Sequence, residues 1–292
     1  MANGWVIGVI GGSGLYEVAG LEKAETIAVE GPWGQPSAPV TRGTLGGRSF
    51  LFLPRHGAGH RTAPGDVNYR ANVDALKRAG ATDLLAISAV GSLREALAPG
   101  HFVAVEQMID RTRGRAASFF GEGVVAHVSM ADPVCPRLTR LATSAAQVAG
   151  ATVHGGATYL AMEGPQFSTR AESRLYRSWG CDVIGMTAMP EAKLAREAEL
   201  PYALMTMVTD YDCWRDGDAV EVEAVLGTMR ENAATAGRML RAFAEALPEV
   251  REPSPIDRVL DLAIVTPPEA RDPDLVAKLD AVYRRAGQPA AG

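Results

Sequence analysis

Two aspartates separated by a single residue, Asp210 and Asp212, are the acidic residues of this sequence that are best placed to do chemistry. They follow an apolar run at residues 203–208, which is typical of a buried strand. Side chains two positions apart in an extended segment point the same way, so both carboxylates can face one ligand in the crevice beyond the strand end. Asp is also a common turn and cap residue, so a polar exit from the strand into the next helix is the competing interpretation.

Three other predicted strand ends carry groups that can hold an anion. The first ends in a Gly-Gly-Ser-Gly loop, whose backbone N–H groups can wrap an anion while Ser13 adds a hydroxyl donor. The second ends at Arg55 and His56, where the arginine offers a planar fork that suits phosphate. The third carries Ser88 shortly before a glycine turn. A plain tight turn at the glycine loop and a solvated surface pair at Arg55 and His56 are the alternatives.

A rigid turn with the sequence Glu-Gly-Pro-Gln-Phe-Ser, residues 163–168, follows another predicted strand. Its ring and hydroxyl, from Phe167 and Ser168, can flank a heterocyclic ligand at the strand end. Phe167 as a simple anchor for the loop is the alternative.

The elements that must position these groups alternate between strands and helices, which is typical of an α/β protein. We expect residues 1–250 to form the main unit and residues 251–292 to form an extension with an apolar run at 260–265 and a final helix over 272–285. Residues 111–123 form a long loop that we predict is too polar to join the core. The patterns predict strands at residues 6–10, 48–53, 84–90, 102–109, 153–161, 182–186 and 203–208, and helices at 68–79, 137–148, 171–177, 191–198 and 219–247.

Composition excludes several functional classes. The chain has 292 residues, 47% of them hydrophobic, which is enough for one large core or two smaller ones. Its net charge of −5, from 34 acidic and 29 basic residues without long runs, predicts no nucleic-acid and no membrane partner. The three cysteines are scattered and the N-terminus has no signal-peptide pattern, so we expect a cytoplasmic protein without disulfides or a zinc site.

Six short motifs, taken together and in order, resemble the 5′-methylthioadenosine phosphorylase family of the trimeric purine nucleoside phosphorylase superfamily. The resemblance covers roughly residues 6–247 and is far more specific than any one motif. It implies a single-domain twisted mixed β-sheet flanked by helices. The motifs are Ile-Gly-Gly-Ser-Gly-Leu at residues 10–15, Pro-Arg-His-Gly at 54–57, Asn-Tyr-Arg-Ala-Asn at 68–72, Glu-Gly-Pro-Gln-Phe-Ser at 163–168, Met-Thr and Pro-Glu at 186–191, and Thr-Asp-Tyr-Asp-Cys-Trp at 209–214.

The implied activity is that of a pentosyltransferase in purine and methionine salvage: phosphate attacks C1′ of a 5′-modified adenosine and releases adenine and a 5-substituted ribose 1-phosphate. Asp210 would give a proton to N7 of the leaving purine, because burial and a neighbouring carboxylate can keep one acid protonated. Asp212, ionised, would accept from the 6-amino group. By resemblance, phosphate would bind to Ser13, Arg55, His56, Ser88 and Ala89, the ribose to Met186 and Thr187, and the base to Phe167, Ser168, Asp210 and Asp212.

The resemblance also implies an apolar pocket for the 5′ substituent and a homotrimer, or a dimer of trimers, whose sites are shared between subunits. No cofactor and no metal are implied, since inorganic phosphate is a co-substrate. The pocket would consist of Val222, Val225 and Leu226, with His127 contributed by a neighbouring subunit.

Three alternatives share some of these features. Ser13 and Ser88 stand where threonine is common in the family, and the chain diverges after Pro255, which leaves the width of the 5′ pocket open. A 5′-deoxy-5′-fluoro(halo)adenosine phosphorylase is therefore the closest competitor. A 6-oxopurine phosphorylase and a nucleoside-binding protein without catalysis fit less well, because Asp210 stands where 6-oxopurine enzymes tend to carry Asn and because binding alone needs no proton donor.

Overall fold

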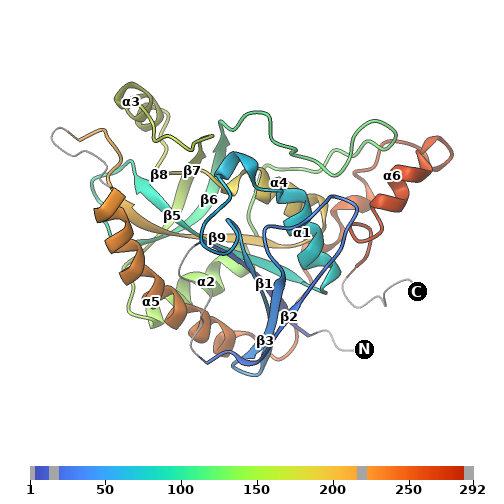
Figure 1. Cartoon of the computed structure of the whole chain (residues 1–292), viewed down its shortest axis with the longest axis horizontal. Coiled ribbons are helices and arrows are strands. Elements are labelled where there is room, and N and C mark those ends of the chain that lie inside the picture. Colours follow the sequence, from blue (N-terminus) through green and yellow to red (C-terminus); the bar gives the residue numbers. More distant parts are fainter. Residues whose placement is uncertain (1–3, 13–19, 216–221, 286–292) are drawn as a thin grey trace.

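The computed structural model describes residues 4–12, 20–215 and 222–285, and within them nine strands form one mixed sheet (Figure 1). The spatial order is β2-β3-β4-β1-β5-β8-β7-β6-β9, with parallel and antiparallel neighbours. The seven strands predicted from the sequence are all present, whereas β2, which is mostly exposed, was not predicted. The strands are β1 Val6–Gly11, β2 Glu22–Ile27, β3 Val40–Leu45, β4 Arg48–Pro54, β5 Asp83–Ser92, β6 Phe102–Asp110, β7 Val153–Ala161, β8 Val183–Gly185 and β9 Tyr202–Asp210.

One half of the sheet closes on itself around β5. This strand pairs in parallel with β9 along most of its length, and its last residues also pair antiparallel with β8. Because β9 in turn pairs with β6, strands β5, β8, β7, β6 and β9 form a closed, barrel-like ring. At Gly91, which pairs with both Ile184 of β8 and Asp210 of β9, the ring brings together strands that are distant in sequence.

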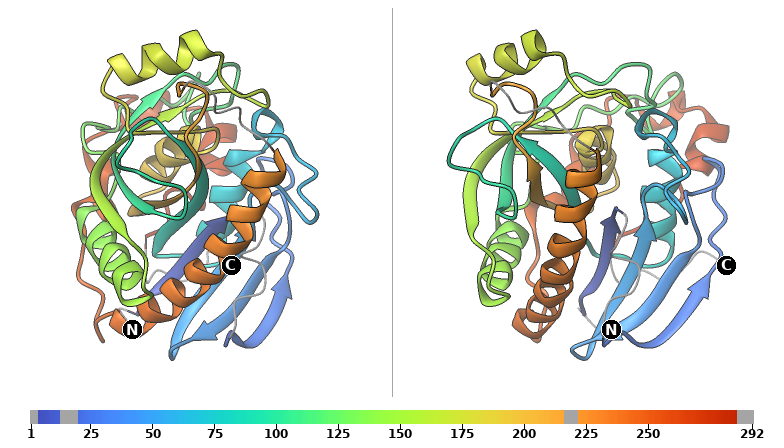
Figure 2. Two further views of the ribbon diagram at one scale, coloured as in Figure 1. Left: turned by 90° about the vertical axis from the view of Figure 1, so that its left-hand side faces the viewer. Right: turned by 60° about the vertical axis from the view of Figure 1, so that its left-hand side comes forward.

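Helices cover both faces of the sheet, as the resemblance implied. Figure 2 shows α2 and α5 packed against each other on one face, while α1 and α4 lie on the other (Figure 1). Local signals explain several helix starts: Asn68 accepts a hydrogen bond from the Ala71 N–H at the start of α1, and Thr169 with Glu172 forms a capping box on α3. The helices are α1 Tyr69–Arg78, α2 Pro136–Val148, α3 Arg170–Ser178, α4 Ala188–Glu197, α5 Val222–Ala246 and α6 Pro273–Lys278, with short 3-10 helices at Pro64–Asp66, Pro255–Asp261 and Pro268–Ala270.

Two large apolar clusters separate along the two faces of the sheet. The α2 and α5 side carries Leu138, Met239 and Phe243, all buried. The opposite cluster includes Leu76 of α1 and Leu194 of α4. The strands supply both clusters because successive side chains point to opposite faces. This arrangement is a three-layer α/β fold of one domain.

The C-terminal extension packs on the same core as the rest of the chain. Leu260, Leu279 and Val282 are buried in the α1 and α4 cluster. Arg251 donates to the fully buried carboxylate of Asp83 at the start of β5, at 2.5 Å from Nε. The predicted final helix over residues 272–285 is too long: α6 ends at Lys278, and turns follow.

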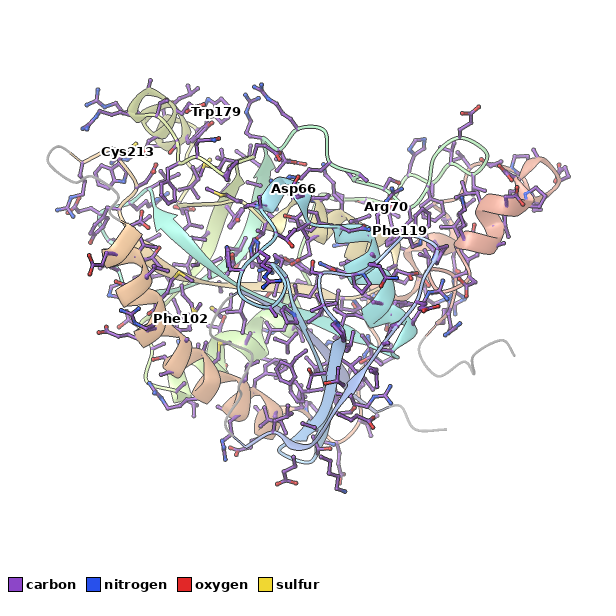
Figure 3. All side chains as sticks on the ribbon, in the orientation of Figure 1. Asp66, Arg70, Phe102, Phe119, Trp179 and Cys213 are labelled. Atoms are coloured by element: carbon purple, nitrogen blue, oxygen red, sulfur yellow. The ribbon has the colours of Figure 1, made fainter. Side chains whose placement is uncertain are left out.

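The prediction for residues 111–123 was wrong about burial. Phe119 is 1% exposed and packs edge-on against Trp33, with 5.2 Å between ring centroids. Glu197 of α4 accepts hydrogen bonds from the Phe119 N–H and the Ser118 hydroxyl, both at 2.7 Å. The loop is polar in sequence because it brings its own hydrogen-bonding groups into the core. Phe119 is labelled in Figure 3.

None of the helices in the described residues is long and apolar enough to cross a membrane.

Candidate active site

A cavity of about 220 Å³ lies where the carboxyl ends of several strands converge. Its walls come from the ends of β1, β4, β5 and β9 and from residues that directly follow β7 and β8. Ligands of α/β proteins bind at this edge because the chain leaves the sheet there in loops that can be shaped independently. The predicted site residues on its wall are Arg55, His56, Ser88, Ala89, Phe167, Met186, Thr187, Asp210, Asp212 and Val225.

A β-bulge aims Asp210 at this cavity. Val90 of β5 pairs with Val208, but the next residue, Gly91, pairs with Asp210, so β9 holds one extra residue, Thr209. The Thr209 hydroxyl lies 2.7 Å from Asp210 Oδ2 and 3.1 Å from the Val90 carbonyl oxygen. Residue 91 must be small, because a Cβ there would lie 3.0 Å from Asp210 Oδ1 and 3.1 Å from Ile184 Cγ2. The Asp210 carboxylate is thus held beside Gly91, where β5 pairs with both β8 and β9.

Asp212 is 4% exposed and turns back toward Asp210. Its φ of 52° lies in the left-handed region, which Asp tolerates better than most residues. Its backbone N–H donates to Asp210 Oδ1 at 2.8 Å, and the Ser168 hydroxyl lies 3.0 and 2.9 Å from its two carboxylate oxygens. The sequence predicted that the two acids point the same way as residues of one strand, whereas a tight turn beyond the strand brings them to one cavity.

Burial raises the pKa of both acids above the usual range for Asp. For Asp210, hydrogen bonds from Thr209 and from the Asp212 N–H oppose this rise in pKa without cancelling it. For Asp212, burial again raises the pKa most, and the neighbouring Asp210 carboxylate adds to the rise. A pair of carboxyl groups with raised pKa values can retain a proton for general acid chemistry.

Arg55 is held differently from the prediction. Its Nε and Nη2 atoms donate to the two carboxylate oxygens of Glu191 at 2.9 and 3.0 Å, and both side chains are 1% exposed. Nη1 and Nη2 also donate to the carbonyls of Ile87 and Ile10, at 3.2 and 3.3 Å. The fork that we expected to grip an anion is therefore filled by Glu191. Of the five N–H groups of an arginine, these contacts leave one Nη1 hydrogen for a ligand in the cavity.

His56 is neutral at physiological pH, because burial lowers its pKa to about 4. Its Nδ1 lies 2.9 Å from the Thr62 carbonyl oxygen, so Nδ1 carries the ring proton and Nε2 is an acceptor. The ring stacks on His60 with 4.2 Å between centroids, and both rings border the cavity. Ser88 and Thr187, whose hydroxyl oxygens are 3.3 Å apart, provide further polar groups at this end.

Other predicted site residues are not among those that the structure shows on the cavity wall. Ser13 is outside the described residues, and the side chain of Val222 is not among those described. Val225 and Met229 of α5 are one helical turn apart and border the cavity together, whereas Leu226 is on the adjacent face and is 47% exposed. His127 is in a segment that pairs with the C-terminal extension, and its N–H donates to the Ala263 carbonyl.

Sequence reasoning missed the partner of Arg55 and two residues on the cavity wall. The partner, Glu191, appeared only as part of a motif, and nothing local connects it to Arg55, which is 136 residues away. Thr209 is the bulge residue, and no pattern within β9 announces the bulge. His60 borders the cavity although a lone exposed histidine gives no such signal. The Arg-His motif at residues 55–56 was the nearest available sign of a second histidine ring. Among the described residues, no three His, Cys, Asp or Glu side chains are grouped so as to hold a metal ion.

A closed mixed sheet with an acid pair, a buried arginine and a neutral histidine around one cavity is suited to binding a small ligand and giving it a proton. The profile of the phosphorylase superfamily matches residues 6–245, and the chain belongs to this superfamily. It is 55% identical to the S-methyl-5′-thioadenosine phosphorylase of Bradyrhizobium diazoefficiens over 283 residues, which cover 96% of this chain and 97% of that protein. The enzyme of the same name from Rhodospirillum rubrum is 56% identical over 284 residues and 96% of both chains.

Solved structures agree with this relationship. A methylthioadenosine phosphorylase from an Antarctic soil metagenomic library matches with a TM-score of 0.91 and 43% identity, covering 97% of this chain and all of that chain. The methylthioadenosine phosphorylase of Schistosoma mansoni, crystallised in complex with adenine, matches with a TM-score of 0.79 and 37% identity, covering 82% of this chain and 91% of that one.

Proposed function

We propose that this protein catalyses the phosphorolysis of S-methyl-5′-thioadenosine to adenine and 5-methylthioribose 1-phosphate. The observation that carries the proposal is a buried acid pair at one end of a cavity whose other end bears the groups suited to an anion. Ser88 and Gly91, beside Asp210, are three residues apart on β5, roughly 10 Å along the strand. That separation suits a ribose placed between an attacking phosphate and a departing base.

In this mechanism a phosphate oxygen forms the bond to C1′ while the bond between C1′ and N9 of the base breaks. The electron pair of the broken bond goes to the purine, and Asp210 neutralises the developing charge by giving its proton to N7. What supports this role is the raised pKa of Asp210 and its fixed position at the bulge. Adenine leaves as the neutral base, and Asp210 regains a proton in the next cycle.

Asp212 favours adenine over 6-oxopurines, since an ionised carboxylate accepts from an amino group but repels a carbonyl oxygen. Ser168 supports this role, because its hydroxyl donates to the Asp212 carboxylate and stabilises the ionised form. Phe167, which is 49% exposed at the cavity, borders the base.

Phosphate binds at the end of the cavity formed by Arg55, His56, Ser88 and Ala89, with Ser13 following the cavity residue Gly12 in the chain. The remaining Nη1 hydrogen of Arg55 and the Ser88 hydroxyl donate to phosphate oxygens. Neutral His56 accepts from a protonated phosphate oxygen through Nε2. No step requires a metal or an organic cofactor, since phosphate is itself the second substrate.

Met186 and Thr187 bind the ribose, and Val225 borders the 5′ substituent together with Val222 and Leu226. The apolar character of Val225 and Met229 supports a thiomethyl group, which cannot form the hydrogen bonds of a hydroxyl. Leu226 lies beside this wall and is exposed, so its contact with the substrate stays a prediction.

We also propose that the protein works in the cytoplasm as a homotrimer in which His127 completes a neighbour's site. The segment that carries His127 pairs with the C-terminal extension through an Ala126–Ile264 bridge. Next to that bridge, Leu262 is 97% exposed and Val265 is 57% exposed, an apolar surface that a second copy would cover. The free thiols of all three cysteines support a reducing compartment.

The deciding experiment is an assay of adenine release with and without inorganic phosphate, using 5′-methylthio-, 5′-fluoro- and 5′-hydroxyl adenosine. We expect phosphate-dependent release that is fastest with the methylthio substrate. Equal rates with all three nucleosides would refute a selective apolar pocket, and release without phosphate would indicate a nucleosidase.

Subunit sharing has its own test. Co-expression of Asp210→Ala and His127→Ala chains should restore activity, because mixed trimers contain some sites with both residues intact. Mixtures no more active than either variant alone would contradict a shared site.

A further inference from the structure

The loop after β6 carries an arginine, Arg115, whose side chain is only 3% exposed although the loop is polar. Arg115 does not border the cavity. Each group that it contacts belongs to a segment that borders the cavity or leads directly into it. Its guanidinium also lies over the ring of Tyr69, 5.4 Å from the centroid.

The first set of contacts holds the turn at residues 163–168. Arg115 Nε donates to the two Glu163 carboxylate oxygens at 3.1 and 3.0 Å, and Nη2 donates to the Glu163 carbonyl at 2.7 Å. The turn then approaches Met186 so closely that a Cβ on Gly164 would lie 2.4 Å from the Met186 sulfur. Phe167, which borders the cavity, follows in the same turn.

The second set fixes the peptide between Met186 and Thr187. Arg115 Nη1 donates to the Met186 carbonyl at 2.7 Å, and the N–H on the other side of that peptide, from Thr187, donates to the Tyr159 hydroxyl at 3.3 Å. Nη1 also donates to the Met189 carbonyl at 2.9 Å. The orientation of this peptide is thereby determined from both sides.

A third contact reaches the cavity through Tyr69. Nη1, which shares its two hydrogens among three acceptors, also lies 3.0 Å from the Tyr69 hydroxyl, and that hydroxyl donates to the carbonyl of Pro64, a cavity residue, at 2.9 Å. One planar cation thus ties together three segments that border the cavity or lead into it. A lysine offers three donors around a single atom and cannot span carbonyl and carboxylate groups in this planar arrangement.

We infer that Arg115 is a positioning residue for the nucleoside: it fixes the position of the Met186 peptide relative to the turn that carries Phe167. The inference rests on the proposed binding of ribose by Met186 and of the base by Phe167. Phosphate meets groups centred on Arg55 and Ser88, and Arg115 reaches them only indirectly, through Thr187, whose hydroxyl lies 3.3 Å from that of Ser88. Loss of Arg115 should therefore weaken nucleoside binding much more than phosphate binding.

The test compares Arg115→Lys, Arg115→Ala and Glu163→Gln with the matched control Arg113→Met, an exposed arginine two residues earlier in the same loop. KM is measured separately for methylthioadenosine and for phosphate, and Kd for adenine and for phosphate is measured by calorimetry. We expect the nucleoside KM and the adenine Kd to rise at least about tenfold in the Arg115 variants, with both phosphate constants within about twofold of wild type.

Glu163→Gln, which keeps the shape of the turn, should show a smaller change of the same kind, so the inference stays testable if an Arg115 variant does not fold. Guanidinium ions at low millimolar concentration should partly restore the nucleoside KM of Arg115→Ala, whereas sodium chloride should not.

Equal weakening of nucleoside and phosphate, or no change in either, would overturn the positioning role. An inactive wild-type enzyme, by contrast, would refute the proposed function itself.

Discussion

Removing the charge of Glu191 is the perturbation whose cost follows most directly from the structure. The carboxylate accepts from Arg55 Nε and Nη2 and from the Tyr202 hydroxyl at 2.9 Å, and no part of the pair reaches solvent appreciably. In Glu191→Gln the side chain keeps its volume and one acceptor, but the guanidinium becomes an uncompensated buried charge. Breaking a buried ion pair in this way costs about 3–5 kcal/mol.

The assay is equilibrium unfolding in urea, with thermal unfolding as a second measure. A loss of this size corresponds to a fall in Tm of roughly 6–20 °C, at about 2–4 °C per kcal/mol for large domains. The control is Arg258→Gln, which breaks an ion pair whose partners are 70% and 35% exposed and should cost at most about 1 kcal/mol.

A double variant separates charge from packing. Arg55→Met combined with Glu191→Gln removes the buried charge and retains an acceptor for Tyr202, so it should be more stable than Glu191→Gln alone while losing phosphate affinity. If the free energy of unfolding of Glu191→Gln is within about 1 kcal/mol of the wild-type value, Arg55 is not held by a desolvated ion pair. Our conclusion that Glu191 occupies most of the Arg55 donors would then be wrong.

Three other predictions concern titration and specificity. The acid role predicts that kcat/KM falls as pH rises through the pKa of Asp210, and that Asp210→Asn, which carries N–H groups at every pH, flattens this part of the pH profile. Asp210→Ala should lower turnover by about 10²–10⁴. An unchanged rate in Asp210→Ala would remove the acid role. Ser168→Ala removes a hydrogen bond to a charged group, which is worth about 1.5–3 kcal/mol. The KM for the nucleoside should therefore rise by about tenfold or more, and discrimination against 6-oxopurine nucleosides should weaken. Steady-state kinetics on both substrate types will measure these changes. Burial lowers the pKa of His56 to about 4, below its unfolded value of about 6.5. Between these values the unfolded chain binds more protons, so stability should increase from pH 4 to pH 6.5, and urea titrations of His56→Gln should show a smaller increase.

Much of the fold was predictable because it depends on local patterns. Continuous apolar runs identified β1, β5 and β9, and apolar periodicity with a glycine stop identified α1. The positions where such runs end located several of the cavity residues, including Arg55, Ser88 and Asp210. This succeeded because the carboxyl ends of parallel strands meet at one edge, so the sequence marks the site without describing its geometry.

The sequence by itself determined which chemical groups gather at that edge: two acids, an arginine beside a histidine, hydroxyls and an aromatic ring. Only the tertiary structure decided what each group is free to do. Glu191 occupies the fork of Arg55 from 136 residues away, and Arg115 joins three segments from a loop that looks solvent-exposed in sequence. Such pairings depend on how distant segments are brought together by the sheet, and the one-residue bulge that aims Asp210 likewise arises from long-range register, which no local propensity encodes.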